Sequence, residues 1–174
     1  MPSRSELLKN GAALAVFSPA LVTSMIKAAE AATPADIELL NRALEDENAG
    51  IKAYEDAATL NLLSPAVLTM VKGFVSDHRA HAAALTAAVK AAGGKPSTTT
   101  PKLQYPSLRS QADIIAFAEK LELGAASLYV SEIGRLSNPQ FSKLLASILG
   151  VETTHVSMLA SALKQDRAYV GFIT

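Results

Sequence analysis

Apolar side chains recur every three or four positions along four stretches of the chain, which is the spacing of one face of an α-helix. Helix-start signals precede three of these stretches. Thr33-Pro34-Ala35-Asp36, Ser64-Pro65 and Asn138-Pro139 each combine an N-cap side chain with proline at the first helical position. Ser110 caps the remaining stretch, and Gly93-Gly94 ends the helix before it. The pattern predicts helices from 36 to about 60, from 65 to 92, from about 110, and from 139 to about 165.

One connection is much longer than the other two. Residues 93–107 are rich in proline, serine and threonine and predict a linker. At up to about 3.5 Å per residue, such a segment spans roughly 50 Å, which exceeds the length of a helix of about 28 residues. We therefore expect an all-α four-helix bundle in which helical hairpins 36–92 and 108–165 are joined by a lengthwise crossover. Residues 166–174 are expected to form a C-terminal tail.

The two hairpins also share a pattern of residues. Matching residues are offset by 74 or 75 positions, in the pairs Glu47 and Glu122, Tyr54 and Tyr129, and His81 and His155. An ordered series through two helices indicates an internal repeat.

The composition of the chain excludes several classes of function and of metal site. A chain of 174 residues with 49% hydrophobic content has room for one sizeable core, so one compact domain is expected. Lys and Arg balance Asp and Glu at 16 each, which gives no basic excess for nucleic-acid phosphates. There is no cysteine, so disulfides and thiolate metal ligands are excluded. Any metal must be bound by oxygen and nitrogen.

The first 35 residues differ from the rest. Arg4 and Lys9 precede the apolar stretch 11–26, and Ala29-Glu30-Ala31 is typical of a signal-peptidase site. The start resembles a twin-arginine signal in which Ser5 replaces the second arginine. We expect residues 1–35 to direct export to the periplasm or outside the cell, by a twin-arginine-like or Sec route. The alternative is a retained segment that serves assembly. The stretch is too short for a membrane span of roughly 20 residues, so none is expected in the mature protein.

Ligand-type side chains interrupt the core-facing positions of every predicted helix. They are Glu47, His78, His81, Glu122, Glu152 and His155. Buried carboxylates each cost several kcal/mol in desolvation and repel one another. Protons or a divalent cation must compensate them. No lysine or arginine occupies the matching positions, so a cation is the simpler solution. Glu152 and His155 have Glu-x-x-His spacing, which places both on one helix face.

With these residues in place, the chain resembles the ferritin-like superfamily of di-iron and di-manganese carboxylate proteins, especially exported bacterial ferritin-like domain proteins. The resemblance covers about residues 36 to 165. In that family two helices each supply a Glu and the other two each supply Glu-x-x-His. It implies one or two Fe or Mn ions per chain, bound by the six residues with Glu152 as the bridge. It also implies that the phenols of Tyr54 and Tyr129 hydrogen-bond a ligand or take part in redox chemistry; packing in the core is their alternative role.

One residue departs from the family pattern. His78 stands where the second helix should supply a glutamate. A neutral imidazole has one lone pair and cannot bridge two metals as a carboxylate does. The site is therefore expected to be asymmetric, to bind a single metal, or to recruit neighbouring Asp77. Other acidic residues are expected to form a solvated face, namely Glu45, Asp46, Glu55 and Asp56.

Two functions follow from this reading. The first is a redox metalloprotein that reacts iron or manganese with dioxygen or peroxide, in a homo-oligomer. The second is a non-catalytic ferritin-like structural, stress-related or self-assembling subunit with a degenerate metal site, for which His78 is the argument.

Overall fold

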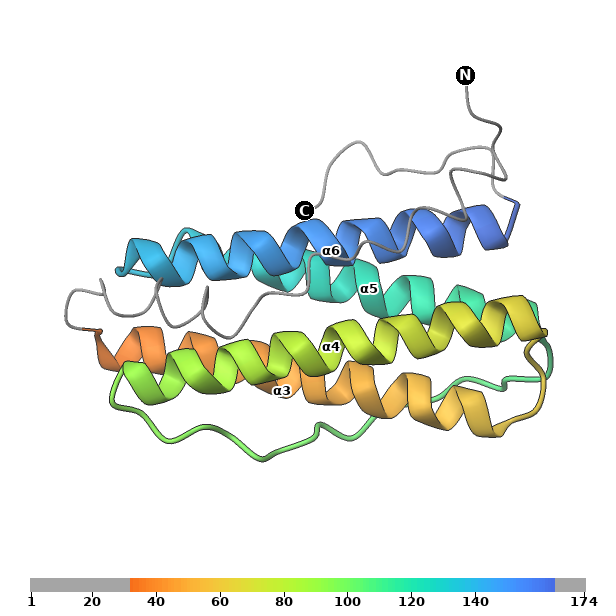
Figure 1. The fold of residues 1–174 in the computed structure, drawn as a ribbon, viewed down its shortest axis with the longest axis horizontal. Helices are drawn as coiled ribbons and strands as arrows, with labels where there is room; N and C mark the ends of the chain where they lie inside the picture. Colours follow the sequence, from red (N-terminus) through yellow and green to blue (C-terminus); the bar gives the residue numbers. More distant parts are fainter. Residues whose placement is uncertain (1–31, 165–174) are drawn as a thin grey trace, which may run out of the picture.

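The computed structural model describes residues 32–164. The predicted tail and nearly all of the predicted N-terminal export or assembly segment lie outside this range. Within it the chain forms α3 (Pro34–Thr59), α4 (Pro65–Ala91), α5 (Gln111–Ile133) and α6 (Pro139–Ala162). No strand occurs between residues 32 and 164. The predicted all-α four-helix bundle is confirmed (Figure 1).

Each helix begins at the N-cap residue that the sequence indicated. Thr33 and Asp36 form a capping box at the start of α3, and the side chains of Ser64, Ser110 and Asn138 accept backbone N–H groups at the starts of the other three helices. These bonds satisfy amide groups that a helix leaves without partners in its first turn. The helix starts are therefore determined locally.

The helices form two hairpins that pack against each other. α3 lies along α4 and α5 lies along α6, while α3 also contacts α5 and α4 contacts α6. The connection from α4 to α5 runs the length of the bundle, so these two helices point in the same direction (Figure 1). A short turn could not produce this arrangement, because it reverses the chain direction.

The crossover is bound to one face of α3. Asn41 Oδ1 accepts the N–H of Ser97 at 2.7 Å, and the Ser97 hydroxyl donates to Glu45 Oε1 at 2.6 Å. One turn further along, Asn48 donates to the carbonyl of Thr99 at 3.1 Å. The helical spacing of these α3 residues places them on one face, so the linker is fixed to the bundle.

The expectation that the acidic residues of α3 are merely solvated is wrong for Glu45, which binds the crossover as described. Asp56 accepts the hydroxyl of Tyr105 at 2.7 Å and lies on the solvated face, with 39% of its side chain exposed. Glu55 is exposed and pairs with Arg79 at 2.6 Å. Sequence periodicity separates core from surface, but it does not show that a linker will cover part of the surface.

Two apolar clusters fill the two ends of the bundle. One contains Leu40, Leu85 and Leu145, and the other contains Phe74 and Ile115 among others. On all four helices the ligand-type residues fall between the segments that build these clusters. They therefore form a polar layer with apolar packing on both sides.

α6 is long and apolar enough to cross a membrane by length and composition alone, a property shared by core helices of soluble proteins. In this bundle its buried face carries Glu152 and His155.

Candidate metal centre

All six sequence-predicted ligands converge in the polar layer. No residue among them is more than 4% exposed; they are Glu47 from α3, His78 and His81 from α4, Glu122 from α5, and Glu152 and His155 from α6. Their candidate ligand atoms form two groups, and within each group these atoms lie within 4.8 Å of one another. The groups share His78 and Glu152.

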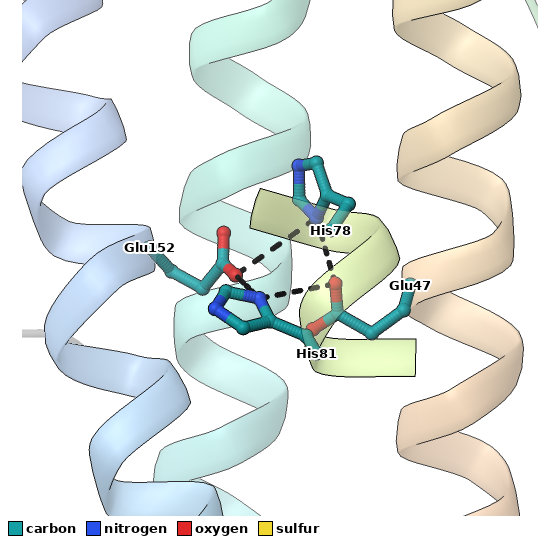
Figure 2. A group of neighbouring side chains, drawn as sticks. All are labelled: Glu47, His78, His81 and Glu152. Atoms are coloured by element: carbon teal, nitrogen blue, oxygen red, sulfur yellow. Dashed lines mark hydrogen bonds and ion pairs between the residues drawn. The ribbon is translucent and has the colours of Figure 1, made fainter. Parts of the chain in front are cut away.

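The first group joins Glu47, His78, His81 and Glu152 (Figure 2). Glu47 Oε2 lies 2.7 Å from Nδ1 of His78 and 3.3 Å from Nδ1 of His81. His81 Nδ1 also lies 3.0 Å from Glu152 Oε1. Side chains from three helices thus meet around one point.

The second group joins His78, Glu122, Glu152 and His155. His155 Nδ1 lies 3.5 Å from Glu122 Oε2 and 3.4 Å from Glu152 Oε2. His78 Nε2 lies 3.3 Å from Glu122 Oε1, so the two nitrogens of this ring face opposite groups.

The two tyrosines are hydrogen-bonded to carboxylates of the layer. The hydroxyl of Tyr54 in α3 donates to Glu122 in α5, and the hydroxyl of Tyr129 in α5 donates to Glu47 in α3. Burial and the adjacent carboxylates raise the pKa of both phenols well above the usual value, so both remain protonated donors. The two tyrosines therefore pack in the core and also orient the glutamates.

Asp77 does not replace the carboxylate missing at position 78. Its Oδ2 lies 3.1 Å from His155 Nε2, on the side of the ring away from Glu122 and Glu152. A carboxylate that accepts one ring N–H leaves the lone pair on the other nitrogen and fixes the ring orientation. Asp77 thus directs Nδ1 of His155 toward the second group. The sequence placed Asp77 beside the centre but gave no signal for this partner.

Several buried polar atoms of the centre have no hydrogen-bond partner. They are Glu122 Oε2, both oxygens of Glu152 and Nδ1 of His155. Buried polar groups without partners are rare because each loses its hydration without replacement. A cation among them would satisfy all three side chains, so the donor set fits a metal ion.

Charges at the centre are strongly coupled. Burial alone lowers the pKa of His81 and His155, but carboxylate partners outweigh it and raise the pKa to about 9 and about 11 respectively. Burial alone raises the pKa of Glu47, but the hydrogen bonds from His78 and His81 bring it down to about 2. Burial and then Glu122 raise the pKa of Glu152. Without a metal, imidazolium groups balance the carboxylates.

A cavity of about 140 Å³ leads to this layer between α3, α5 and the crossover. Pro101 and Leu103 of the crossover line it, together with Asp46, Glu47 and Glu122 among others. Burial and then Glu47 raise the pKa of Asp46 to about 7.

One expectation is corrected at this cavity. Asp46 lines the cavity, although it was expected on a solvated face. Its position carries no sequence signal for a cavity.

Comparisons with known proteins agree with this architecture. The family model described as a ferritin-like domain matches residues 35–165. No curated protein matches the chain.

Three similar solved structures illustrate the fold. A ferritin-like, diiron-carboxylate protein from Bacillus anthracis is 21% identical, with a TM-score of 0.62, 74% of this chain covered and 94% of that chain. A conserved hypothetical protein from Mycobacterium tuberculosis is 20% identical, with a TM-score of 0.68 and coverages of 79% and 96%. Rhodobacter capsulatus bacterioferritin, with a metal-free dinuclear site, is 21% identical, with a TM-score of 0.60 and coverages of 74% and 83%. These identities support likeness of fold.

Proposed function

Because this chain belongs to the family of ferritin-like domain proteins, we propose that it binds iron or manganese in the polar layer and reacts the metal with dioxygen or peroxide. The observation that carries the proposal is the set of unpartnered buried atoms on Glu122, Glu152 and His155. A scaffold without a ligand would gain stability from apolar side chains at these positions. The Bacillus anthracis neighbour is described as a diiron-carboxylate protein, which agrees with the proposal.

The six predicted ligands would hold the metal through carboxylate oxygens and imidazole nitrogens. This mixed donor set suits Fe(II), Mn(II) and Zn(II). A bound redox metal would supply single electrons to a small oxidant. Iron and manganese are distinguished by elemental analysis of protein purified from its native host, since recombinant protein takes up whichever metal is abundant.

The chain itself orients the ligands and limits access. Tyr54 and Tyr129 each donate a hydrogen bond to a glutamate, which leaves that carboxylate less free to rotate. Apolar clusters on both sides exclude bulk water from the layer. The cavity of about 140 Å³ has room for a few water-sized molecules, given that liquid water occupies about 30 Å³ per molecule.

The test is anaerobic addition of Fe(II) to metal-free protein, followed by oxygen-electrode recording on mixing with air-saturated buffer. A parallel arm replaces oxygen by hydrogen peroxide and follows peroxide loss. We expect oxidant consumption above the rate of iron in buffer, and its loss in Glu152→Gln. Gly124→Ala is the matched control, because Gly124 is exposed and a Cβ there meets no neighbour within 4 Å. Folded wild-type protein that stays inert with both oxidants would refute the redox proposal.

A non-catalytic scaffold is the second candidate. It is favoured by His78, which removes a carboxylate from the centre, and by the internal pairing of that imidazole with Glu47 at 2.7 Å. Native protein that is folded yet free of stoichiometric metal would support this candidate over the first.

Export concerns the segment 1–35, nearly all of which lies outside the described range. We propose that the segment 1–35 directs export, and that the mature protein forms a homo-oligomer. N-terminal sequencing of protein from periplasmic or extracellular fractions tests the first point, with a start after Ala31 expected. Light scattering of the full chain and of a chain lacking residues 1–31 tests the second. An unchanged oligomer would exclude a role of this segment in assembly.

A further inference from the structure

The two halves of the centre are not equivalent. On the Glu47 side the carboxylate has partners at both oxygens: Tyr129 donates to Oε1, while His78 and His81 contact Oε2. On the other side Glu122 Oε2, Glu152 Oε2 and His155 Nδ1 face one another at 3.4–3.5 Å and make no hydrogen bond. In the first half a cation therefore displaces the bonds of Glu47, and the unpartnered atom there is Glu152 Oε1, 3.0 Å from His81 Nδ1. In the second half it supplies missing partners to three atoms.

His78 reinforces this difference. Its Nδ1 lies 2.7 Å from Glu47 Oε2, the shorter of the contacts of the ring with the two glutamates, and its Nε2 lies 3.3 Å from Glu122 Oε1. A neutral imidazole carries one N–H and one lone pair. When Nδ1–H donates to Glu47, the lone pair on Nε2 points to the second half. His78 then serves a cation on the Glu122 side only.

Gly50 determines where this ring lies. A Cβ on Gly50 would be 3.0 Å from Cε1, 3.1 Å from Nδ1 and 3.2 Å from Nε2 of His78. On another side the ring stacks on Tyr54, with centroids 5.5 Å apart and planes at 25°. With its nitrogens close to Glu47 and Glu122, the ring cannot move without lengthening these contacts. Glycine is unfavourable inside a helix, so Gly50 is explained by the space that it leaves for the imidazole.

We propose that the centre binds one divalent cation per chain, held by Glu122, Glu152, His155 and Nε2 of His78. Glu47 acts from outside this set by orienting His78, as Asp77 orients His155. Gly50 is a positioning residue that seats the His78 ring. The inference rests on the metal-binding part of the proposed function and is independent of its redox part.

Zn(II) tests the stoichiometry, because it is redox-inert and accepts four nitrogen and oxygen ligands. Isothermal titration of metal-free protein should give one zinc per chain. Glu47→Gln should retain that stoichiometry with affinity reduced by roughly 10- to 100-fold, as expected for loss of an orienting partner. Glu122→Gln should abolish binding.

The outcomes separate this inference from the proposed function. Two equivalent zinc ions per chain, or loss of binding in Glu47→Gln as complete as in Glu122→Gln, would overturn the inference while leaving a metal centre. Wild-type protein that binds no zinc in this titration would overturn both the inference and the metal-binding part of the proposed function. Circular dichroism of each variant verifies that the bundle is folded.

Gly50→Ala tests the positioning role. We expect zinc affinity to fall on the order of 10-fold, the lower end of the range for such partners. Gly73→Ala and Gly124→Ala are matched controls in which a Cβ meets no neighbour within 4 Å. In a His78→Ala background, Gly50→Ala should no longer alter zinc affinity, because the ring that it displaces is absent. An equal effect of Gly50→Ala in both backgrounds, or no larger effect than the controls, would overturn this role.

Discussion

Opposite changes in stability are expected when two carboxylates of the metal-free centre are replaced in turn by glutamine. Neither oxygen of Glu152 has a well-aligned hydrogen bond, although Oε1 lies 3.0 Å from His81 Nδ1. Burial followed by Glu122 raises the pKa of Glu152 against the opposing effect of His155 and His81. Glutamine is a neutral isostere of the protonated acid, and its amide can donate to the unpartnered Glu122 Oε2. Because an unsatisfied buried group costs about 1–3 kcal/mol, Glu152→Gln should stabilise metal-free protein by roughly 1 kcal/mol.

Glu47→Gln, in contrast, should destabilise the metal-free protein. The hydrogen bonds from His78 and His81 outweigh burial and lower the pKa of Glu47 from 4.5 to about 2. Because its pKa is lower in the folded protein than in the unfolded chain, ionised Glu47 stabilises the fold. This contribution is complete above pH 4.5 and is lost as the pH falls toward 2. At about 1.4 kcal/mol per pKa unit, the loss at pH 7 is on the order of 3 kcal/mol.

Urea unfolding at pH 7 with a chelator, followed by helical circular dichroism, measures both changes. The slopes of free energy against urea should be equal among wild type and variants, so that the midpoints report stability. Adding zinc should then raise the midpoint of Glu47→Gln and leave that of Glu152→Gln unchanged, since only a protein that binds the ion is stabilised by it. Equal destabilisation of the two metal-free variants would refute the reasoning, because it would mean that Glu152 is as well compensated as Glu47.

Three further results are expected. Burial lowers the pKa of His81, but its carboxylate partners outweigh this effect and raise the pKa to about 9. Metal-free protein should therefore lose on the order of 3 kcal/mol of stability between pH 6.5 and 9. Urea midpoints that stay constant over this pH range would contradict the prediction. Tyr129→Phe should lower the free energy of unfolding by about 1–2 kcal/mol, as it removes a donor from buried Glu47; a smaller loss than in exposed Tyr105→Phe would contradict this. Leu145→Ala should cost about 2–5 kcal/mol without changing the zinc stoichiometry, and altered stoichiometry would show that site and core are not separable.

Local chemistry explains why much of the fold was predictable. Thr33 and Ser64 satisfy amides of the helix that each begins, so a few neighbouring residues determine where these helices start. The length of the segment 93–107 determined that it could cross the bundle. The burial of Glu47 and Glu122 also followed from sequence, since a side chain in step with apolar neighbours at helical spacing must face the same way.

The contacts within the centre did not follow from sequence. A step of one residue rotates the helix face by about 100°, so a small error in orientation exchanges surface and cavity positions, as at Asp46. Likewise, the bond between His155 in α6 and Asp77 in α4 joins two residues that lie 78 positions apart in the chain.

The sequence by itself therefore determined which side chains enter the interior and roughly at what depth, because helix periodicity and capping are properties of adjacent residues. Only the tertiary structure decided which oxygen meets which nitrogen. It showed that both oxygens of Glu47 have partners whereas Glu122 Oε2 has none, and that the His78 ring lies against Gly50. Those relations depend on how four helices are rotated and spaced against one another, which is set by the packing of the whole core.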